Sequence, residues 1–350
     1  MTTVGQLMMV GIEGTRVTSE HRLFLKETGV GGVILFERNY ESPKQIAEFI
    51  AELREAAEAP LVVGVDQEGG KVARFGSPFT ELPAMAELGG LGERGPQLAC
   101  EVGGVLASEL RAVGVDIDFA PVLDVATNPQ SRVIGDRALA ASAEAVAGLG
   151  RAIVRGLQGE GLAACGKHFP GHGDTDVDSH LGLPVLPHTR ARFDACEFVP
   201  FRAAIEEGVA AMMIAHILAP NLDRTEPASV SGNVVRGILR GELGFSGLVF
   251  TDDLTMKGIA DVYPPYDAAW RAIAAGADMV MVCRRPDEQR AALEGIRRAV
   301  GEGWLGMHAV TAAMERLEGF RRRYVGKERP PMKVIGSRAH RKIAKQIRNP

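Results

Sequence analysis

The sequence predicts a (β/α)8 TIM-like barrel, and two observations carry that prediction. Short, nearly continuous apolar runs recur along the chain, and longer amphipathic stretches separate them. Strands buried on both faces of a parallel sheet have this composition, and their regular alternation with helices is typical of a closed barrel. The eight runs are Leu7–Ile12, Gly32–Phe36, Leu61–Asp66, Val115–Phe119, Ala163–His168, Ala211–His216, Leu248–Asp252 and Asp278–Cys283.

The amphipathic stretches carry signals for helix starts and ends. Ser42 is followed by Pro43 and by Gln45, which predicts an N-cap, a proline at the first helical position and a capping box. Glycines at 208, 244 and 276 follow other apolar stripes and are predicted helix ends. The alternative fold is a doubly wound open sheet. It finds little support, because Gly29–Gly32 precedes a strand, whereas a dinucleotide-binding fingerprint follows one.

The charge of the chain is distributed unevenly. Residues 321–350 contain 11 Lys or Arg and one Glu, whereas residues 1–320 contain 29 basic and 43 acidic side chains. We therefore expect one catalytic barrel domain over residues 1–325 and a basic, solvated C-terminal extension over residues 326–350. A basic tail can bind nucleic acid or anionic lipid, but the acidic body argues against nucleic acid as a substrate.

Cysteine usage and the N-terminus indicate a cytoplasmic protein. The four cysteines show no CxxC pair, which favours reduced thiols over a disulfide framework. The first residues contain neither a basic stretch nor a small-residue cleavage site. No apolar run approaches the roughly 20 residues that span a bilayer. We expect no membrane span and take a monomer as the default.

Polar residues stand at the ends of several predicted strands. Asp66, His168, His216 and Asp252 each close an apolar run. In barrels of this class the active site lies at the carboxyl ends of the strands, and buried charges are costly unless they bind something. The pattern predicts the rim of an active site.

Two segments carry the candidate chemistry. Gly166–His180 contains three histidines, at 168, 172 and 180, which fit a metal site, a structural loop or a catalytic loop. The second segment, Gly247–Met256, delivers two carboxylates, Asp252 and Asp253, at the end of an apolar strand. One of them can cap the following helix, which leaves the other for chemistry.

These segments resemble the family 3 glycoside hydrolases, and in particular their single-domain β-N-acetylglucosaminidase branch. The resemblance rests on the run Lys-His-Phe-Pro-Gly-His-Gly from Lys167, followed by Asp178-Ser179-His180, and on the match of residues 238–252 to the family's active-site signature. Residues 64–74 and 119–124 are similar too. The resemblance covers roughly residues 5–320, so the basic tail lies outside it.

The resemblance implies a role for each matching residue. Asp252, not Asp253, is the nucleophile, and Asp178 and His180 form the acid/base dyad. His172 shapes the loop, and neither a cofactor nor a metal is required. Asp66 and Lys167 could instead form a structural ion pair, and Arg74 could be a surface residue. The implied contacts to N-acetylglucosamine are Asp66, Arg74, Arg137, Lys167 and His168, with Arg137 resting on a weaker match.

The implied activity is that of a retaining, exo-acting β-N-acetylglucosaminidase. Its partner is a small carbohydrate, a GlcNAc-containing glycoside or a muropeptide from peptidoglycan recycling. Phosphorolysis is an alternative, because a neutral histidine base places no second negative charge in the path of a phosphate. A metal-dependent hydrolase would use the histidines and Asp252 as ligands. A sugar-binding barrel without activity and a broad β-glucosidase are further alternatives, but the latter usually carries a second domain.

Overall fold

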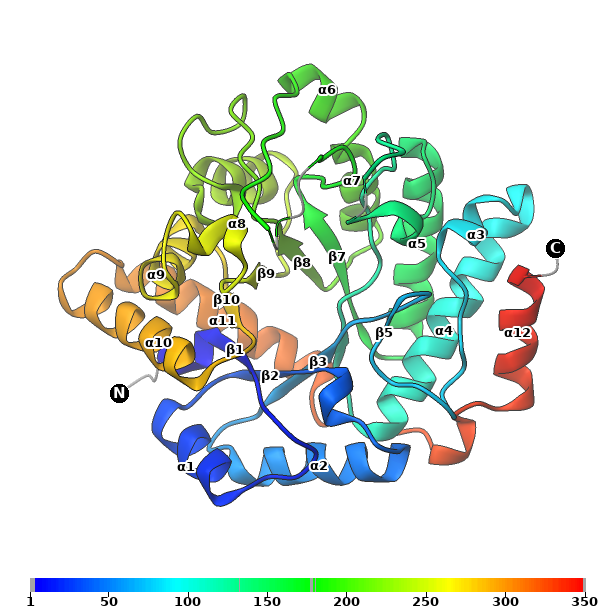
Figure 1. Cartoon of the computed structure of the whole chain (residues 1–350), viewed down its shortest axis with the longest axis horizontal. Helices are drawn as coiled ribbons and strands as arrows, with labels where there is room; N and C mark the ends of the chain where they lie inside the picture. Colours follow the sequence, from blue (N-terminus) through cyan, green and yellow to red (C-terminus); the bar gives the residue numbers. More distant parts are fainter. Residues whose placement is uncertain (1–3, 132, 177–178, 180, 349–350) are drawn as a thin grey trace.

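A computed structural model describes residues 4–131, 133–176, 179 and 181–348, and its parallel strands form a closed eight-stranded barrel (Figure 1). Around the barrel the order is β1, β10, β9, β8, β7, β6, β3 and β2. The predicted (β/α)8 fold is confirmed, because each predicted run contains one strand. The strands are β1 Met8–Gly11, β2 Gly32–Leu35, β3 Val62–Val65, β6 Ile117–Asp118, β7 Ala163–Phe169, β8 Ala211–Ile214, β9 Leu248–Asp253 and β10 Met279–Val282.

Helices surround the barrel and bury apolar faces against it (Figure 1). The longer ones are α1 Ser19–Thr28, α2 Pro43–Ala56, α4 Gly95–Val113, α5 Ala143–Gly159, α7 Phe198–Glu206, α9 Pro265–Ala275, α10 Pro286–Gly301, α11 Met307–Tyr324 and α12 Arg338–Arg348. Short helices are α3 Ala86–Gly89, α6 Arg190–Ala195 and α8 Lys257–Ala260, and a π-helix spans Asn233–Glu242.

The predicted helix signals are confirmed in position and corrected in detail. Ser42 caps α2 by accepting a hydrogen bond from the Gln45 amide at 3.2 Å. The side chain of Gln45 accepts from the amide of Glu41 instead of that of Ser42, so no capping box forms. Gly276 ends α9 with φ of 114°. The stretch before Gly244 is a π-helix rather than an α-helix, and this difference lies beyond what apolar spacing can predict.

The interior of the barrel is packed with side chains. The rings of Phe119 and Phe250 meet edge to face inside it, with centroids 5.4 Å apart. Leu317, Phe320 and Tyr324 of α11 belong to the same interior cluster and cover the amino ends of the strands. The barrel is therefore a core and not a pore, as in other barrels of this class.

A two-stranded hairpin stands on the carboxyl end of β3. It consists of β4 Gln67–Gly69 and β5 Val72–Ala73, paired antiparallel. Gly69 and Gly70 form its turn with φ of 105° and 56°, a conformation that other residues adopt at a cost. The side-chain oxygen of Gln67 accepts hydrogen bonds from the amides of Arg74 and Phe75 at 2.8 and 3.0 Å. The hairpin is thus tied back on itself.

The C-terminal helix α12 packs on the outside of the barrel helices, beside α4 and α3 (Figure 1). Ala344 and Ile347 are buried in this contact, whereas Arg341, Lys342 and Lys345 are exposed. The expectation of a solvated extension is wrong for the apolar side of this helix, because Ala344 and Ile347 are buried there. Among the described helices, none combines the length and the apolarity that crossing a membrane requires.

Candidate active site

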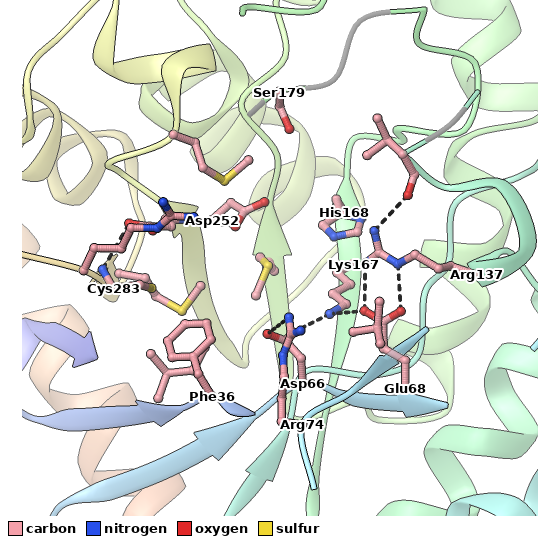
Figure 2. A pocket seen from close by; sticks show the side chains of 18 of the residues that line it. Phe36, Asp66, Glu68, Arg74, Arg137, Lys167, His168, Ser179, Asp252 and Cys283 are labelled. Carbon is pink, nitrogen blue, oxygen red and sulfur yellow. Dashed lines mark hydrogen bonds and ion pairs between the residues drawn. The ribbon is translucent and has the colours of Figure 1, made fainter. Parts of the chain in front are cut away.

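A cavity of about 630 Å³ opens at the carboxyl ends of the strands (Figure 2). Three different strands bring predicted residues to it. Asp66 follows β3, Lys167 and His168 lie in β7, and Asp252 lies in β9. Arg74 comes from the loop after the hairpin, and Arg137 from the short 3-10 turn Gly135–Arg137. Of the predicted rim residues, Asp66, His168 and Asp252 therefore converge on one cavity, whereas His216 does not line it.

Cations and carboxylates alternate on the wall of the cavity that faces Asp252 (Figure 2). The Nζ of Lys167 donates to Asp66 Oδ1 at 2.6 Å and lies 2.5 Å from Glu68 Oε1. Arg137 donates to both oxygens of Glu68, at 2.8 and 2.7 Å. Arg74 Nη2 lies 3.5 Å from Asp66 Oδ2. Asp66 and Lys167 do form an ion pair, and both border the cavity.

Burial and charge work against each other in this cluster. Burial alone raises the pKa of Glu68, but the neighbouring Lys167 and Arg137 outweigh it and lower that pKa to about 2. Burial alone lowers the pKa of Lys167, but Asp66 and Glu68 raise it above its ordinary value. Glu68 and Lys167 are therefore both charged at neutral pH. The site presents a fixed set of hydrogen-bond donors and acceptors.

His168, in β7, and His172, just after that strand, share one buried carboxylate. Asp124 Oδ2 lies 2.7 Å from Nδ1 of His168, and Asp124 Oδ1 accepts from the amide of His172. Because the pKa of Asp124 is lowered by these partners despite its burial, the carboxylate is ionised and Nδ1 of His168 carries the proton. This leaves Nε2 of His168 for a ligand in the cavity.

His172 is neutral and has a structural environment. Its ring lies 2.5 Å from Thr175 Oγ1 and 3.2 Å from Ser179 Oγ. Burial, and then the nearby His168, lower its pKa to about 4. These contacts support the expectation that His172 shapes the loop.

The two carboxylates at the end of β9 have different surroundings. Asp253 Oδ1 accepts from the amides of Thr255 and Cys283, at 3.0 and 3.1 Å, and Asp253 Oδ2 accepts from the Thr255 hydroxyl at 2.8 Å. Asp253 thus ties β9 to the turn that follows it and to the end of β10. Asp252 accepts from the amide of Asp253 at 2.8 Å, and both residues border the cavity. This division favours Asp252 over Asp253 for chemistry.

The predicted acid/base dyad, Asp178 and His180, lies outside the described residues. Ser179, between them in the sequence, is buried and borders the cavity. Its carbonyl accepts from the amide of Gly258 at 2.8 Å. Ser179 is thus the described residue of the predicted Asp-Ser-His motif, and it lies at the cavity.

The structure also separates residues that sequence reasoning had grouped or missed. His216 lies two residues after β8, its ring contacts Ser229 Oγ at 2.8 Å and the carbonyl of Asp253 at 3.0 Å, and it is not among the described residues that line the cavity. Glu68 and Asp124 were not singled out, although both lie in motifs that carry the family resemblance. The signal was present in the acidic residues of these motifs.

Metal ligation finds no support in the described part of the chain. No three His, Cys, Asp or Glu side chains are grouped there so that they could hold a metal ion. The ring of His168 is engaged by Asp124 and that of His172 by hydroxyl groups. The site is built instead for hydrogen bonding and for carboxylate chemistry.

Comparison with known proteins places the chain in a family. Residues 2–319 match the sequence profile of the glycosyl hydrolase family 3 N-terminal domain. A β-hexosaminidase of Thiobacillus denitrificans is 47% identical over 289 residues, which cover 81% of this chain and 80% of the relative. The barrel, its carboxylate-lined cavity and this match define a glycoside hydrolase. The chain belongs to glycosyl hydrolase family 3.

Solved structures agree with this placement. A family 3 β-N-acetylglucosaminidase from Paenibacillus sp. superimposes with a TM-score of 0.93 at 40% identity, covering 99% of this chain and 67% of that one. NagZ from Neisseria gonorrhoeae superimposes with a TM-score of 0.86 at 34% identity, covering 98% of both chains. The similarity extends over the C-terminal helix as well as the barrel.

Proposed function

We propose that this glycoside hydrolase is a retaining, exo-acting β-N-acetylglucosaminidase that removes terminal β-linked GlcNAc. The observation that carries the proposal is Asp252, placed at the end of β9 on the cavity that the Lys167 cluster borders on another side. The names of its relatives support GlcNAc as the sugar. Release of GlcNAc from muropeptides in the cytoplasm, during peptidoglycan recycling, is the biological setting that we propose.

In the first step, a carboxylate oxygen of Asp252 attacks the anomeric carbon and the bond to the aglycone oxygen breaks. The transition state has oxocarbenium character, and the product is a covalent glycosyl-enzyme. His180 donates the proton that the leaving oxygen needs. In the second step His180 takes a proton from water, and that water displaces Asp252 with overall retention. Asp178 orients the imidazole and stabilises its charged form.

The cluster around Lys167 binds the sugar. Asp66 and Glu68 are ionised acceptors, whereas Arg74, Arg137 and Lys167 are donors with fixed positions. Hydrogen bonds to charged groups are stronger than neutral ones, so these side chains favour the many hydroxyls of a sugar. His168 adds one further polar contact through Nε2.

The shape of the cavity supports exo cleavage. Lys167 and Glu68 lie at its closed end with 2% of each side chain exposed, whereas Arg284 and Arg285 at its mouth are exposed. Its volume of about 630 Å³ suits a small ligand. A terminal sugar can enter the closed end, and the rest of the glycoside then leads out through the mouth.

Trapping the covalent intermediate tests the proposal. A 5-fluoro derivative of an activated GlcNAc glycoside should slow the second step more than the first, so the enzyme accumulates with the sugar attached. Mass spectrometry of peptides should then find the label on Asp252. Label on Asp253, or on neither residue, would contradict the mechanism. The Asp253→Asn variant is the control, because it should still be labelled if it folds.

Three further measurements separate the alternatives. His180→Ala should slow turnover of an aryl β-N-acetylglucosaminide by about 100- to 10,000-fold, the usual contribution of general acid/base catalysis. Adding phosphate should leave GlcNAc as the product, whereas GlcNAc 1-phosphate would establish a phosphorylase. Chelator treatment should leave the rate unchanged, whereas loss of activity would favour a metal-dependent hydrolase.

A further inference from the structure

The C-terminal segment reaches the loop that follows the β4–β5 hairpin. Gly336, which has φ of 60°, lies so close to this loop that a Cβ added there would stand 2.1 Å from the carbonyl oxygen of Pro78. Helix α12 then runs beside α4 and α3, far along the sequence from the residues that it contacts (Figure 1). The contact joins the end of the chain to the region that carries Glu68 and Arg74.

One buried carboxylate organises this contact. Glu109 of α4 is 3% exposed. From the loop it accepts the amide and the hydroxyl of Thr80, at 2.8 and 2.7 Å. From the C-terminal segment it accepts the amide of Gly336 at 2.9 Å, and Nδ1 of His340 lies 2.7 Å from the same oxygen. Glu109 is therefore shared between the loop and the C-terminal segment.

Glu109 is held ionised by these partners. Burial alone raises its pKa, but the hydrogen bonds from His340, Thr80 and Gly336 outweigh burial and bring the pKa below its ordinary value. A buried carboxylate that loses a donor is costly, because the remaining charge has no water to replace it. Without His340, only Thr80 and Gly336 fix the position of this carboxylate, so Glu109 can shift relative to the loop.

The loop is in turn tied to the hairpin. The amide of Gly70, at the hairpin turn, donates to the carbonyl of Leu82 at 3.1 Å. Phe75 and Phe79 pack against each other and against Tyr40, whose hydroxyl donates to the Ser77 carbonyl at 3.0 Å. Movement at Thr80 is therefore transmitted to a hairpin with Asp66 and Arg74 at its two ends.

We propose that the C-terminal segment positions the sugar-binding hairpin through the contact of His340 and Gly336 with Glu109. His340 is a positioning residue and contacts no substrate. Asp252 stands on β9, away from this contact, so the segment governs binding of the sugar and not the chemical step. The expected effect on sugar binding rests on the proposed glycosidase activity, whereas the expected effect on the position of the hairpin does not.

Kinetics of full-length variants test the proposal. His340→Ala should raise KM for an aryl β-N-acetylglucosaminide by about three- to tenfold, the equivalent of one weakened hydrogen bond, and change kcat by less than about twofold. His340→Gln, whose amide N–H can still donate to Glu109, should recover part of the loss. A fall in kcat with unchanged KM would overturn the proposal.

The matched control is Ile347→Ala, on the same helix. Ile347 is 2% exposed and packs in the core, and its loss should lower the Tm without touching Glu109. Its KM should stay at the wild-type value. An equal rise of KM in both variants would mean that helix stability alone matters, and the positioning role would be wrong. Lys345→Ala, an exposed change, should alter neither quantity.

Hydrogen exchange provides a readout that does not depend on the substrate. Amides of residues 67–82 should exchange faster in His340→Ala than in Ile347→Ala. Equal exchange in the two variants would overturn the proposal even if the enzyme is active. If the wild-type protein fails to cleave the glycoside but exchange differs as expected, the proposed function fails and the positioning role stands.

Discussion

The two ends of the barrel use the same chemistry for different purposes. At the amino ends of the strands, Asp278 is fully buried and accepts from the amide of Val249, from Arg240 at 2.7 Å and from Arg316 at 2.8 Å. Asp116 accepts from the amide of Val63 and from Arg54, at 2.8 and 2.7 Å. These carboxylates join strands to helices.

At the carboxyl ends, Asp66 and Glu68 are also paired with Lys and Arg, but their ion pairs border an open cavity. The two kinds of carboxylate differ in their place along the strand. Asp116 and Asp278 come just before β6 and β10, whereas Asp66 comes just after β3. In a parallel barrel this one difference decides which end a side chain occupies. A buried ion pair therefore becomes a candidate for function when it follows its strand.

Removal of the proposed nucleophile should give the largest contrast between the two ends. Asp252→Ala should lower kcat by about four orders of magnitude or more, as loss of a catalytic nucleophile commonly does, with little change in Tm. Steady-state kinetics and thermal unfolding check both parts. Asp253→Asn should instead lower mainly the Tm, because it weakens the hydrogen bonds that Asp253 accepts from Thr255 and Cys283. A fully active Asp252→Ala would refute the assignment.

The central cation of the Lys167 cluster should come next. Lys167→Met leaves the buried Glu68 and the half-buried Asp66 without their shared partner, and kcat/KM should fall by roughly 30- to 5,000-fold, the equivalent of about 2–5 kcal/mol. Lys71→Met, on the β4–β5 hairpin, is the matched control, because Lys71 forms an exposed pair with Asp136 at 3.0 Å. The control should change kcat/KM very little, because exposed ion pairs contribute little. A weak effect of Lys167→Met on kcat/KM would remove it from the sugar site.

A change at the amino end should affect stability and leave catalysis intact. Arg54→Met removes the cation that pairs with the buried Asp116 and should cost about 3–5 kcal/mol in the free energy of unfolding. Urea denaturation measures that cost, and KM and kcat at 25 °C should stay near their wild-type values. A fall in kcat/KM as large as that expected for Lys167→Met would contradict the distinction between the two ends of the barrel.

The smallest expected effect concerns the pH dependence of stability. Burial lowers the pKa of His172 from 6.5 to about 4, so between these pH values the unfolded chain binds a proton that the folded protein does not bind. The contribution of His172 to the free energy of unfolding is therefore complete above pH 6.5. It is lost as the pH falls toward 4, by about 3 kcal/mol at most. His172→Gln should flatten unfolding free energies across this window. His308→Gln, an exposed control, should keep the slope of the wild type.

Much of the barrel could be predicted because its strands are buried on both faces. Continuous apolar runs such as 61–66 and 248–252 leave few other interpretations, and each ends in the residue that meets the cavity. Placing Asp66, His168 and Asp252 together then needed nothing beyond parallel strand direction, whereas Lys167 was implied by the family resemblance. Their roles in catalysis and binding remain predictions for the experiments above.

Other features depend on contacts across the chain that spacing does not encode. The strands of the hairpin are three and two residues long, too short for a periodic pattern. Asp252 and Asp253 differ because the end of β10 supplies the amide of Cys283 to one of them. The docking of α12 depends on Glu109, more than 200 residues earlier.

The Lys167 cluster has a consequence for the energetics of ligand binding. Its side chains hold one another in place through contacts of 2.5 to 3.5 Å. The entropy lost in ordering these long side chains is therefore spent during folding, and an incoming sugar needs only to displace solvent. The fixed donors and acceptors also select among sugars by geometry. A hydroxyl in the wrong orientation would place a donor against a donor, or an acceptor against an acceptor, and the fixed side chains cannot rotate to relieve the mismatch. Discrimination between sugar epimers would then arise from stiffness rather than from the number of contacts.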